Sequence, residues 1–300
     1  MISDKYYIMK KTILGIIGII IAMGCLAQAD TMSTRNQNDT IRIGGMIILK
    51  RGNPNDGNNL RVTLGNRRQK RSPNINTSGL IVDLGFANWV DKTNYGSATS
   101  GGYLVNRPRQ APLGPGDFEL KTTKSSNINI WFFMQRLNLI KHHVNLKYGL
   151  GIELNNYRFQ SAISLKEEGA NPYNPSLYIN HPYIFEDSIS FSKNKLAADY
   201  VTIPFMLNFA TNPNSVNNGL SVSAGVSVGY LYNSRNKQIS TERGKLKNHG
   251  NYDLENWKFS YVAELGLGPV HLYGSYSPNS IFSNGLNLMP YAVGIRFSNW

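Results

Sequence analysis

Residues Leu220 to Tyr232 read LSVSAGVSVGYLY, and this stretch decides the fold. Every second residue is apolar, while the positions between them carry Ser or Gly, except for Leu231. A period of two places the apolar side chains on one face of a β-strand and the small ones on the other. Small residues suit a crowded interior, and the two tyrosines at the end of the apolar face are typical of a membrane interface. Since a tilted strand of roughly 10 residues spans the lipid core, we predict a transmembrane β-strand with its apolar face in lipid.

Seven other stretches have strand-like patterns, so the chain is expected to form eight strands. They cover residues 79–90, 125–139, 144–159, 198–210, 220–232, 257–267, 270–276 and 291–299. The connections after the first, third, fifth and seventh strands are long, and the other three are short. An even strand number with long exterior loops and short periplasmic turns is the outer-membrane pattern. The sequence therefore predicts an all-β protein, an eight-stranded antiparallel transmembrane β-barrel. The predicted exterior loops cover residues 91–124, 160–197, 233–256 and 277–290.

A soluble antiparallel sandwich or a lipocalin-like barrel would also bury alternate residues, but both would leave polar outer faces. In this chain the large residues share one phase and the small or charged residues the other, which favours the membrane barrel. Two places are irregular. The run from Trp131 to Met134 is apolar on both faces, so the phase of its strand stays open. Pro204 lacks a backbone donor, which predicts a bulge or weak pairing within its strand.

The first 29 residues have the organisation of a secretory signal peptide. Three lysines precede an apolar run that ends at Leu26, and Ala27-Gln28-Ala29 supplies a cleavage site after Ala29. The run has about 14 residues, which is short for a membrane helix, and an uncleaved anchor is the alternative. We predict a signal peptide over residues 1–29, a short N-terminal periplasmic extension over residues 30–76 and the outer-membrane barrel over residues 77–300.

Charge and cysteine content narrow the partners and the chemistry. The formal net charge is +13 at pH 7, which in a soluble protein would suggest nucleic acid. In an exported protein it suggests outer-membrane lipid, lipopolysaccharide or an acidic protein partner instead. Cys25 is the only cysteine and lies within the predicted signal peptide, so the mature chain is expected to have no thiol or disulfide chemistry. Lipid modification of Cys25, which follows Gly24, is the alternative.

Six charged residues fall on the predicted inward faces of the strands. They are Asp83, Lys147, Glu153, Lys258, Glu264 and Arg296. Side chains can fill the interior of an eight-stranded barrel, and an unpaired charge there costs several kcal/mol. The three acids and three bases are therefore expected to pair in a lumen without an open pore, in an arrangement that the sequence leaves open. A gated proton or ion path, and hence a small channel, is the alternative.

The predicted exterior loops are the expected working surface. The third loop carries a basic set that would hold lipopolysaccharide phosphates: Arg235, Lys237, Arg243, Lys245 and Lys247. The second loop, over residues 161–195, is rich in Tyr, Asn and Pro. That composition suits contact with protein or glycan and equally suits plain loop packing.

No cofactor and no metal site are predicted, because the five histidines are scattered and no spacing such as H-E-x-x-H occurs. Some eight-stranded barrels are enzymes that modify outer-leaflet lipid with a His and a Ser or carboxylate near the outer rim. His181 and His249 lie in predicted exterior loops and are the candidates for such a site. Convergence of either histidine with a Ser or carboxylate would favour the enzyme.

Several stretches resemble the PorT-like family of outer-membrane β-barrels. They are TIRIGGMIILK (40–50), NLIKHHVNLKYGLGIELNNYRF (138–159), DYVTIPFMLN (199–208) and YAVGIRFSNW (291–300). The resemblance implies an eight-stranded barrel in the outer membrane of a Gram-negative bacterium. The eponymous member takes part in protein secretion, but most of the family has no assigned function, and a fold does not transfer a role. We therefore expect a non-enzymatic outer-membrane barrel with a binding, envelope or secretion role.

Overall fold

The computed structural model describes residues 74–212, 219–268 and 270–297, together with the backbone of three short strands before them. The predicted signal peptide and most of the predicted extension lie outside the described residues. The chain divides into two units, Met1–Arg71 and Ser72–Trp300. In the first unit, an antiparallel sheet has the order β1 (Thr40–Ile43), β2 (Met46–Leu49) and β3 (Val62–Thr63).

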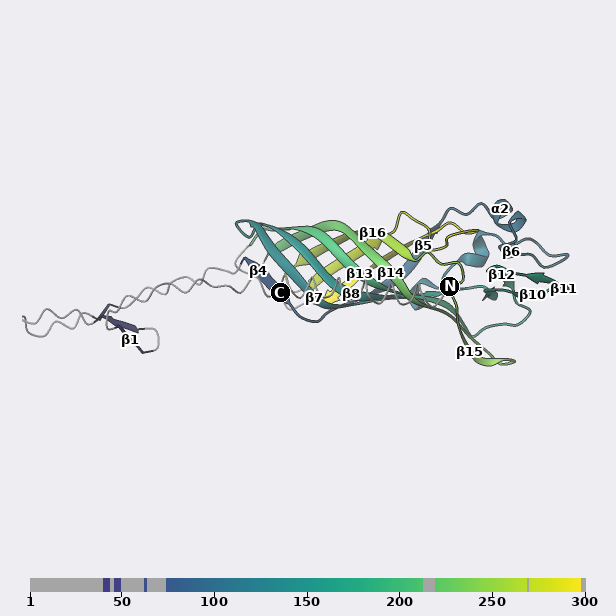
Figure 1. Cartoon of the computed structure of the whole chain (residues 1–300), viewed down its shortest axis with the longest axis horizontal. Coiled ribbons are helices and arrows are strands. Elements are labelled where there is room, and N and C mark those ends of the chain that lie inside the picture. Colours follow the sequence, from purple (N-terminus) through teal and green to yellow (C-terminus); the bar gives the residue numbers. More distant parts are fainter. Residues whose placement is uncertain are drawn as a thin grey trace, which may run out of the picture. The chain divides into compact units, whose positions relative to one another are not determined.

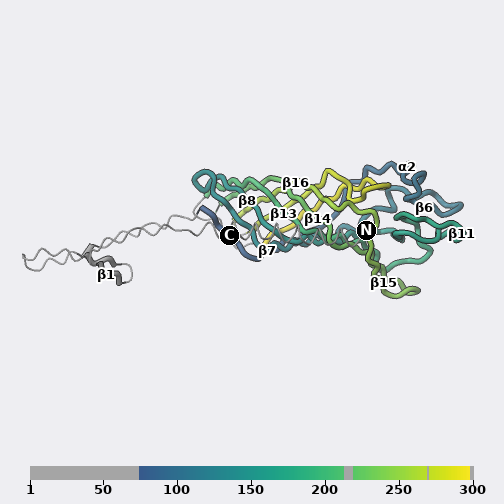
Figure 2. The backbone as a smooth tube through the Cα atoms, viewed as in Figure 1, coloured from purple at the N-terminus to yellow at the C-terminus, as the bar shows by residue number. Residues whose placement is uncertain are grey.

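The second unit contains a closed antiparallel barrel, which Figures 1 and 2 show from the side. Its strands are β5 (Ile81–Asp91), β7 (Ser126–Ile140), β8 (Val144–Arg158), β13 (Lys193–Ala210), β14 (Leu220–Ser240), β16 (Trp257–Leu267), β17 (Val270–Tyr276) and β18 (Leu288–Phe297). Each strand pairs with the next one along the chain, and β18 pairs with β5 to close the barrel. The short strand β4 (Ile75–Ser78) pairs with β7 beyond the start of β5. The predicted eight-stranded antiparallel fold is confirmed.

Large apolar side chains cover the outer face of the barrel. Val222 and Val226 are 44% and 47% exposed, whereas Ser221, Ser223 and Ser227 between and beside them are buried. Other strands expose Leu84, Phe86, Phe205, Leu207, Phe259, Leu272, Val293 and Ile295. Removing one such side chain from water is worth roughly 1.5–3 kcal/mol, so a continuous apolar band of this kind belongs in lipid.

A β-bulge in β7 settles the phase that the sequence left open. The register of β7 against β8 shifts between Trp131 and Phe133, so the strand has one extra residue there. Trp131 and Met134 are buried in the barrel, whereas Phe132 is exposed on the outer face. The run is apolar on both sides because the bulge changes which residues point inward.

Pro204 weakens strand pairing as predicted. The register of β13 against β8 passes from the pair Thr202–Gly151 to the pair Phe205–Tyr148, and the residues between have no partner in β8. On its other side, Pro204 stays in register with Ser227 of β14. The missing proline N–H therefore interrupts one of the two ladders of β13.

Two predicted loops are partly strand. β13 begins at Lys193 and β14 continues to Ser240, so residues 193–197 and 233–240 are paired rather than looped. Within the rest of the predicted third loop, β15 (Gly244–His249) folds back and pairs with β14. These segments escaped prediction because they are polar and basic, and apolar alternation ends where a strand leaves lipid.

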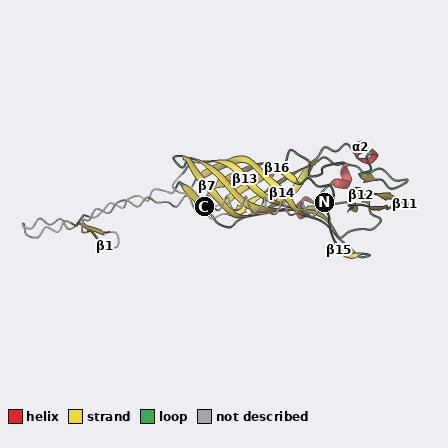
Figure 3. Cartoon of the chain, viewed as in Figure 1, coloured by secondary structure: helices red, strands yellow, loops and turns green. Residues whose placement is uncertain are grey.

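The long connections build an ordered cap at one end of the barrel (Figures 1 and 3). The cap is defined as residues 92–125, 159–192, 241–256 and 277–287. Besides β15, it contains α2 (Tyr95–Ser100), β6 (Leu104–Val105), β9 (Ile163–Lys166), β10 (Gly169–Asn171), β11 (Asn174–Ile179), β12 (Tyr183–Glu186) and two short 3-10 turns, Pro115–Phe118 and Thr122–Lys124. No helix in the described part of the chain is long and apolar enough to cross a membrane.

An apolar core joins the cap to the barrel mouth. Trp89 of β5 packs against Tyr157 of β8 with ring centroids 4.9 Å apart, and its Nε1 donates to the Phe118 carbonyl at 3.1 Å. Tyr200 and Leu254, both almost fully buried, belong to the same cluster. The barrel interior therefore ends under a packed layer of aromatic and aliphatic side chains.

Candidate functional site: the charged lumen and the cap

The structure places all six predicted inward charges inside the barrel. Asp83, Lys147, Glu153, Lys258, Glu264 and Arg296 are each at most 8% exposed. They come from β5, β8, β16 and β18, where the inward positions alternate with lipid-facing apolar ones. Neutral asparagines and serines fill much of the space between them, including Asn127, Asn129, Asn155, Ser223 and Ser260.

Arg296 is the centre of the larger charge cluster. Its Nε and Nη2 donate to the two carboxylate oxygens of Asp83 at 2.7 and 2.8 Å, and its Nη1 donates to Glu264 Oε2 at 2.7 Å. Lys147 Nζ donates to Glu264 Oε1 at 2.8 Å. A planar guanidinium matches a carboxylate in two-point contact, which fixes these strands relative to one another as well as neutralising the charges.

Lys258 and Glu153 form a second ion pair. Glu153 Oε1 also accepts a hydrogen bond from Asn155 Nδ2 at 3.1 Å. Tyr273 donates its hydroxyl hydrogen to Asn127 Oδ1 at 2.5 Å, and Asn127 Nδ2 donates to Asn155 Oδ1 at 2.8 Å. The second pair is therefore embedded in a chain of neutral hydrogen bonds that runs across the lumen.

Sequence reasoning missed two lumen residues. His271 is buried, with Nδ1 3.1 Å from Glu264 Oε1. Its inward phase follows from the alternation in β17, since it lies two residues before the buried Tyr273. Arg136 pairs in register with Lys147 and so shares the inner face. The bulge in β7 hid it, because the phase of β7 was unknown from sequence.

A small cavity remains in the lumen beside the charge clusters. Its wall includes Asp83, Glu153, Glu264, Tyr273 and Arg296. The wall also includes Trp131, Met206 and Val262, so charged and apolar side chains line the cavity together. Outside this lining, the Tyr200 ring of the apolar core lies 5.4 Å from Lys258 Nζ.

The five residues of the predicted basic loop do not form one patch. Arg235 donates to Asp199 Oδ2 at 2.7 Å. Arg243 makes a two-point contact with Asp187, at 2.7 and 3.0 Å. On the same β14–β15 hairpin, Lys237 is in register with Lys247, and Lys245 precedes Lys247 by two residues. Both arginines are therefore held by carboxylates, and the three lysines form a separate group.

The contact between Asp187 and Arg243 is expected to make the stability of the cap depend on pH. Burial alone would raise the pKa of its carboxyl group, but hydrogen bonds from Arg243 and Ser164 outweigh burial and lower the pKa below 3.8. A carboxyl group whose pKa is lower in the folded chain than in the unfolded chain stabilises the folded state. This stabilisation is complete above the unfolded-state pKa and is lost as the pH falls through the folded-state pKa. We expect the contact to be intact at neutral pH and its stabilising effect to decline once the pH falls below about 4, with a total loss of about 1 kcal/mol because Arg243 is partly exposed.

Limited proteolysis after Arg243 at pH 7 and pH 3, with an acid-active and a neutral protease calibrated on denatured chain, measures this loss. The matched control is Asp187→Asn, which should be cleaved faster at pH 7 and lose the pH dependence. Equal protection of the wild-type hairpin at both pH values would contradict the assignment.

His181 and His249 do not meet catalytic partners in the described part of the chain. His181 packs against the Tyr103 ring, and its Nδ1 lies 3.0 Å from the Pro182 carbonyl oxygen. His249 Nδ1 lies 3.2 Å from Asn233 Oδ1. Within the same residues, no group of three or more His, Cys, Asp and Glu side chains is arranged to hold a metal ion.

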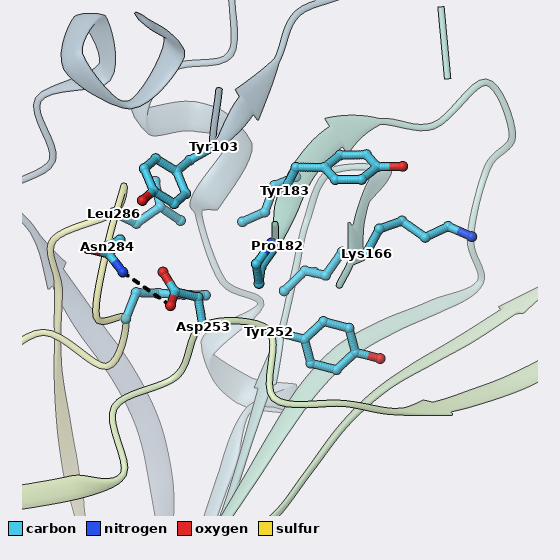
Figure 4. A pocket seen from close by; sticks show the side chains of 11 residues that line it. Tyr103, Lys166, Pro182, Tyr183, Tyr252, Asp253, Asn284 and Leu286 are labelled. Carbon is cyan, nitrogen blue, oxygen red and sulfur yellow. Dashed lines mark hydrogen bonds between the residues drawn. The ribbon is translucent and has the colours of Figure 1, made fainter. Parts of the chain in front are cut away.

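The cap has a small pocket of its own (Figure 4). Tyr103, Pro182 and Leu286 form apolar walls around Asp253. Asp253 Oδ1 accepts a hydrogen bond from Asn284 Nδ2 at 3.2 Å, whereas Oδ2 is buried without a protein partner. All four connections of the cap contribute residues to this pocket.

The chain matches the model of a family described as outer membrane protein beta-barrel domain over residues 95–283. Two solved structures of Ail, the attachment invasion locus protein of Yersinia pestis, are similar to this chain at 11% sequence identity. Each alignment covers 74% of this chain and 98% of the Ail chain. Their TM-scores are 0.28 and, for the complex with the heparin analogue sucrose octasulfate, 0.27. No curated protein matches the chain. The family match extends over more than half of the sequence and agrees with the closed barrel, so the chain belongs to the outer membrane protein β-barrel domain family.

Proposed function

We propose that this outer-membrane barrel is a non-enzymatic, non-conducting anchor that displays its cap outside the cell. The observation that carries the proposal is the lumen, in which paired charges lie beneath an apolar core. Ions cross a pore only along a continuous polar path, and the aromatic layer of Trp89, Tyr157 and Tyr200 interrupts such a path.

The same proposal includes the topology. Both ends of the barrel sequence and the short turns lie on the side opposite the cap, which corresponds to the periplasm in barrels of this kind. Cleavage after Ala29 would leave residues 30–76 in the periplasm. N-terminal sequencing of the protein purified from membranes tests the cleavage site, and a first residue other than Asp30 would require a different boundary.

Conductance tests the sealed lumen. Barrels reconstituted in a planar bilayer are expected to show no steady current, while a porin reconstituted in parallel shows open channels. A small channel is the second candidate, because the wall of the cavity beside Arg296 contains the charged side chains that an ion path requires. Steady single-channel steps from the purified protein would favour the channel over the anchor.

A lipid-modifying activity has weaker support, since neither His181 nor His249 contacts a Ser or a carboxylate among the described residues. Mass spectrometry of lipid A incubated with the reconstituted protein should show unchanged acyl chains and phosphates.

The PorT-like resemblance supports a place in an envelope or secretion complex. Crosslinking in intact cells, followed by identification of the captured proteins, distinguishes such a component from a solitary barrel. Reproducible capture of one envelope protein supports the complex, and capture of none supports the solitary anchor.

A further inference from the structure

Four basic residues form one row across four neighbouring strands. Arg158 of β8 is in register with Lys195 of β13, Lys195 with Lys237 of β14, and Lys237 with Lys247 of β15. Neighbouring strands lie about 4.8 Å apart, so the row spans roughly 14 Å. The next row toward the hairpin tip adds Lys193 and Lys245 on either side of Ile239. We call the six basic residues of these two rows the basic wall.

The basic wall lies on the outer face of the sheet, above the lipid-facing band. In β14, the outward residues are even-numbered up to Tyr232, and beyond it the partly exposed positions include Arg235, Lys237 and Ile239. The change occurs because Tyr232 is the extra residue where the register against β13 shifts between Asp199 and Tyr200. The bulge therefore turns Lys237 outward, on the same side as the membrane-interface pair Tyr230 and Trp257.

Distance along the strand puts the wall just above the membrane surface. Lys237 is five residues beyond Tyr232, which is roughly 17 Å of strand and about 13 Å of height at the usual tilt. A lysine side chain adds several ångströms of reach toward the lipid. Lipopolysaccharide carries its phosphates on lipid A and on the adjoining core sugars, which lie at this level.

The wall is electrostatically unfavourable as it stands, because like charges directly opposite one another on a sheet repel. Burial, followed by the charges of Lys193, Arg235 and Lys237, lowers the pKa of Lys195 to about 8. Lys193, Lys245 and Lys247 lower the pKa of Lys237. Asp199, which lies on β13 four residues beyond Lys195, already forms an ion pair with Arg235 and does not neutralise the wall. An anionic partner would remove this repulsion.

We propose that the basic wall binds the phosphate groups of lipopolysaccharide in the outer leaflet around the barrel. The assignment rests on the proposed function for the cap-outside topology. The proposed phosphate site differs from the five basic loop residues predicted from the sequence, because it lies on two rows across the strands and includes Arg158, Lys193 and Lys195. Arg235 and Arg243 are excluded because each already holds a carboxylate.

Binding to defined probes tests the wall. The protein in detergent is titrated with phosphorylated rough lipopolysaccharide, with the same lipopolysaccharide after dephosphorylation, and with inorganic polyphosphate. The variant Lys195→Gln/Lys237→Gln/Lys247→Gln should bind phosphorylated lipopolysaccharide about 100-fold more weakly at low ionic strength, since each surface lysine contributes about fivefold. The difference should shrink at high salt. The matched control Lys92→Gln/Arg109→Gln/Lys166→Gln removes the same charge from exposed cap positions and should bind within about twofold of wild type.

Two binding results would overturn the proposal. Equal binding of lipopolysaccharide by the Lys195→Gln/Lys237→Gln/Lys247→Gln variant (the row variant) and by the control variant would overturn the assignment of the site to the basic wall. Wild-type binding to polyphosphate as tight as to lipopolysaccharide would overturn the assignment of lipopolysaccharide as the ligand. The row variant should be no less stable than wild type to heat, because it relieves repulsion; a loss of stability would assign the lysines a structural role instead. Labelling of Lys237 by a membrane-impermeant amine reagent in intact cells reports the topology separately. Absent labelling with intact binding would therefore count against the proposed function and not against the wall.

Discussion

Replacing Arg296 by Met is expected to destabilise the barrel by about 3–5 kcal/mol, because it leaves a buried carboxylate without its cation. Arg296 makes a two-point contact with Asp83 and a third bond to Glu264. Glu264 would keep Lys147, but Asp83 would keep only neutral donors, Asn129 Nδ2 and Trp131 Nε1. Urea unfolding in lipid vesicles, followed by the heat-dependent gel mobility typical of folded barrels, measures the loss.

The double variant Arg296→Met/Asp83→Asn separates stranded charge from lost packing. Asparagine keeps the shape of Asp83 and removes its charge, so the double variant should be more stable than Arg296→Met alone. A single variant within about 1 kcal/mol of wild type would mean that water reaches the cluster, and the sealed lumen would have to be abandoned.

The sequence predicted the membrane-embedded part of the fold well for a physical reason. Lipid on one side and a crowded lumen on the other impose opposite demands on alternate residues, so the run from Leu220 to Tyr232 carries both its structure and its orientation. The predicted bounds of β16 and β17 agree with the structure to the residue. The six inward charges likewise followed from phase alone.

The strands of the cap and the rows of the basic wall could not be predicted from alternation of apolar residues. Residues 233–240 read NSRNKQIS and form a strand, yet both faces are polar outside lipid, so the period of two has no hydropathy signal. Arg136 was hidden by the bulge at Phe132. Lys195 and Lys247 are far apart in sequence, and their register with Lys237 is a property of pairing, which charge counting cannot supply.

Replacing Val226 by Arg is expected to destabilise the barrel by about 2–4 kcal/mol, because this position lies at the middle of the lipid-facing run of β14. Its side chain is 47% exposed on the outer face, between Phe205 of β13 and Tyr261 of β16. An arginine there must either remain in hydrocarbon or draw water and headgroups inward. The free energy of unfolding in vesicles is again the measurement.

The matched control is Tyr232→Arg on the same strand, at the membrane interface, where the cost should be about 0–1 kcal/mol. Since both variants introduce the same residue into the same strand, their difference reports depth in lipid rather than the chemistry of arginine. A soluble barrel with an exposed apolar face would tolerate both substitutions equally, since water solvates the guanidinium at either position. A difference near zero would therefore argue against the lipid contact on which the proposed anchor and the basic wall both depend.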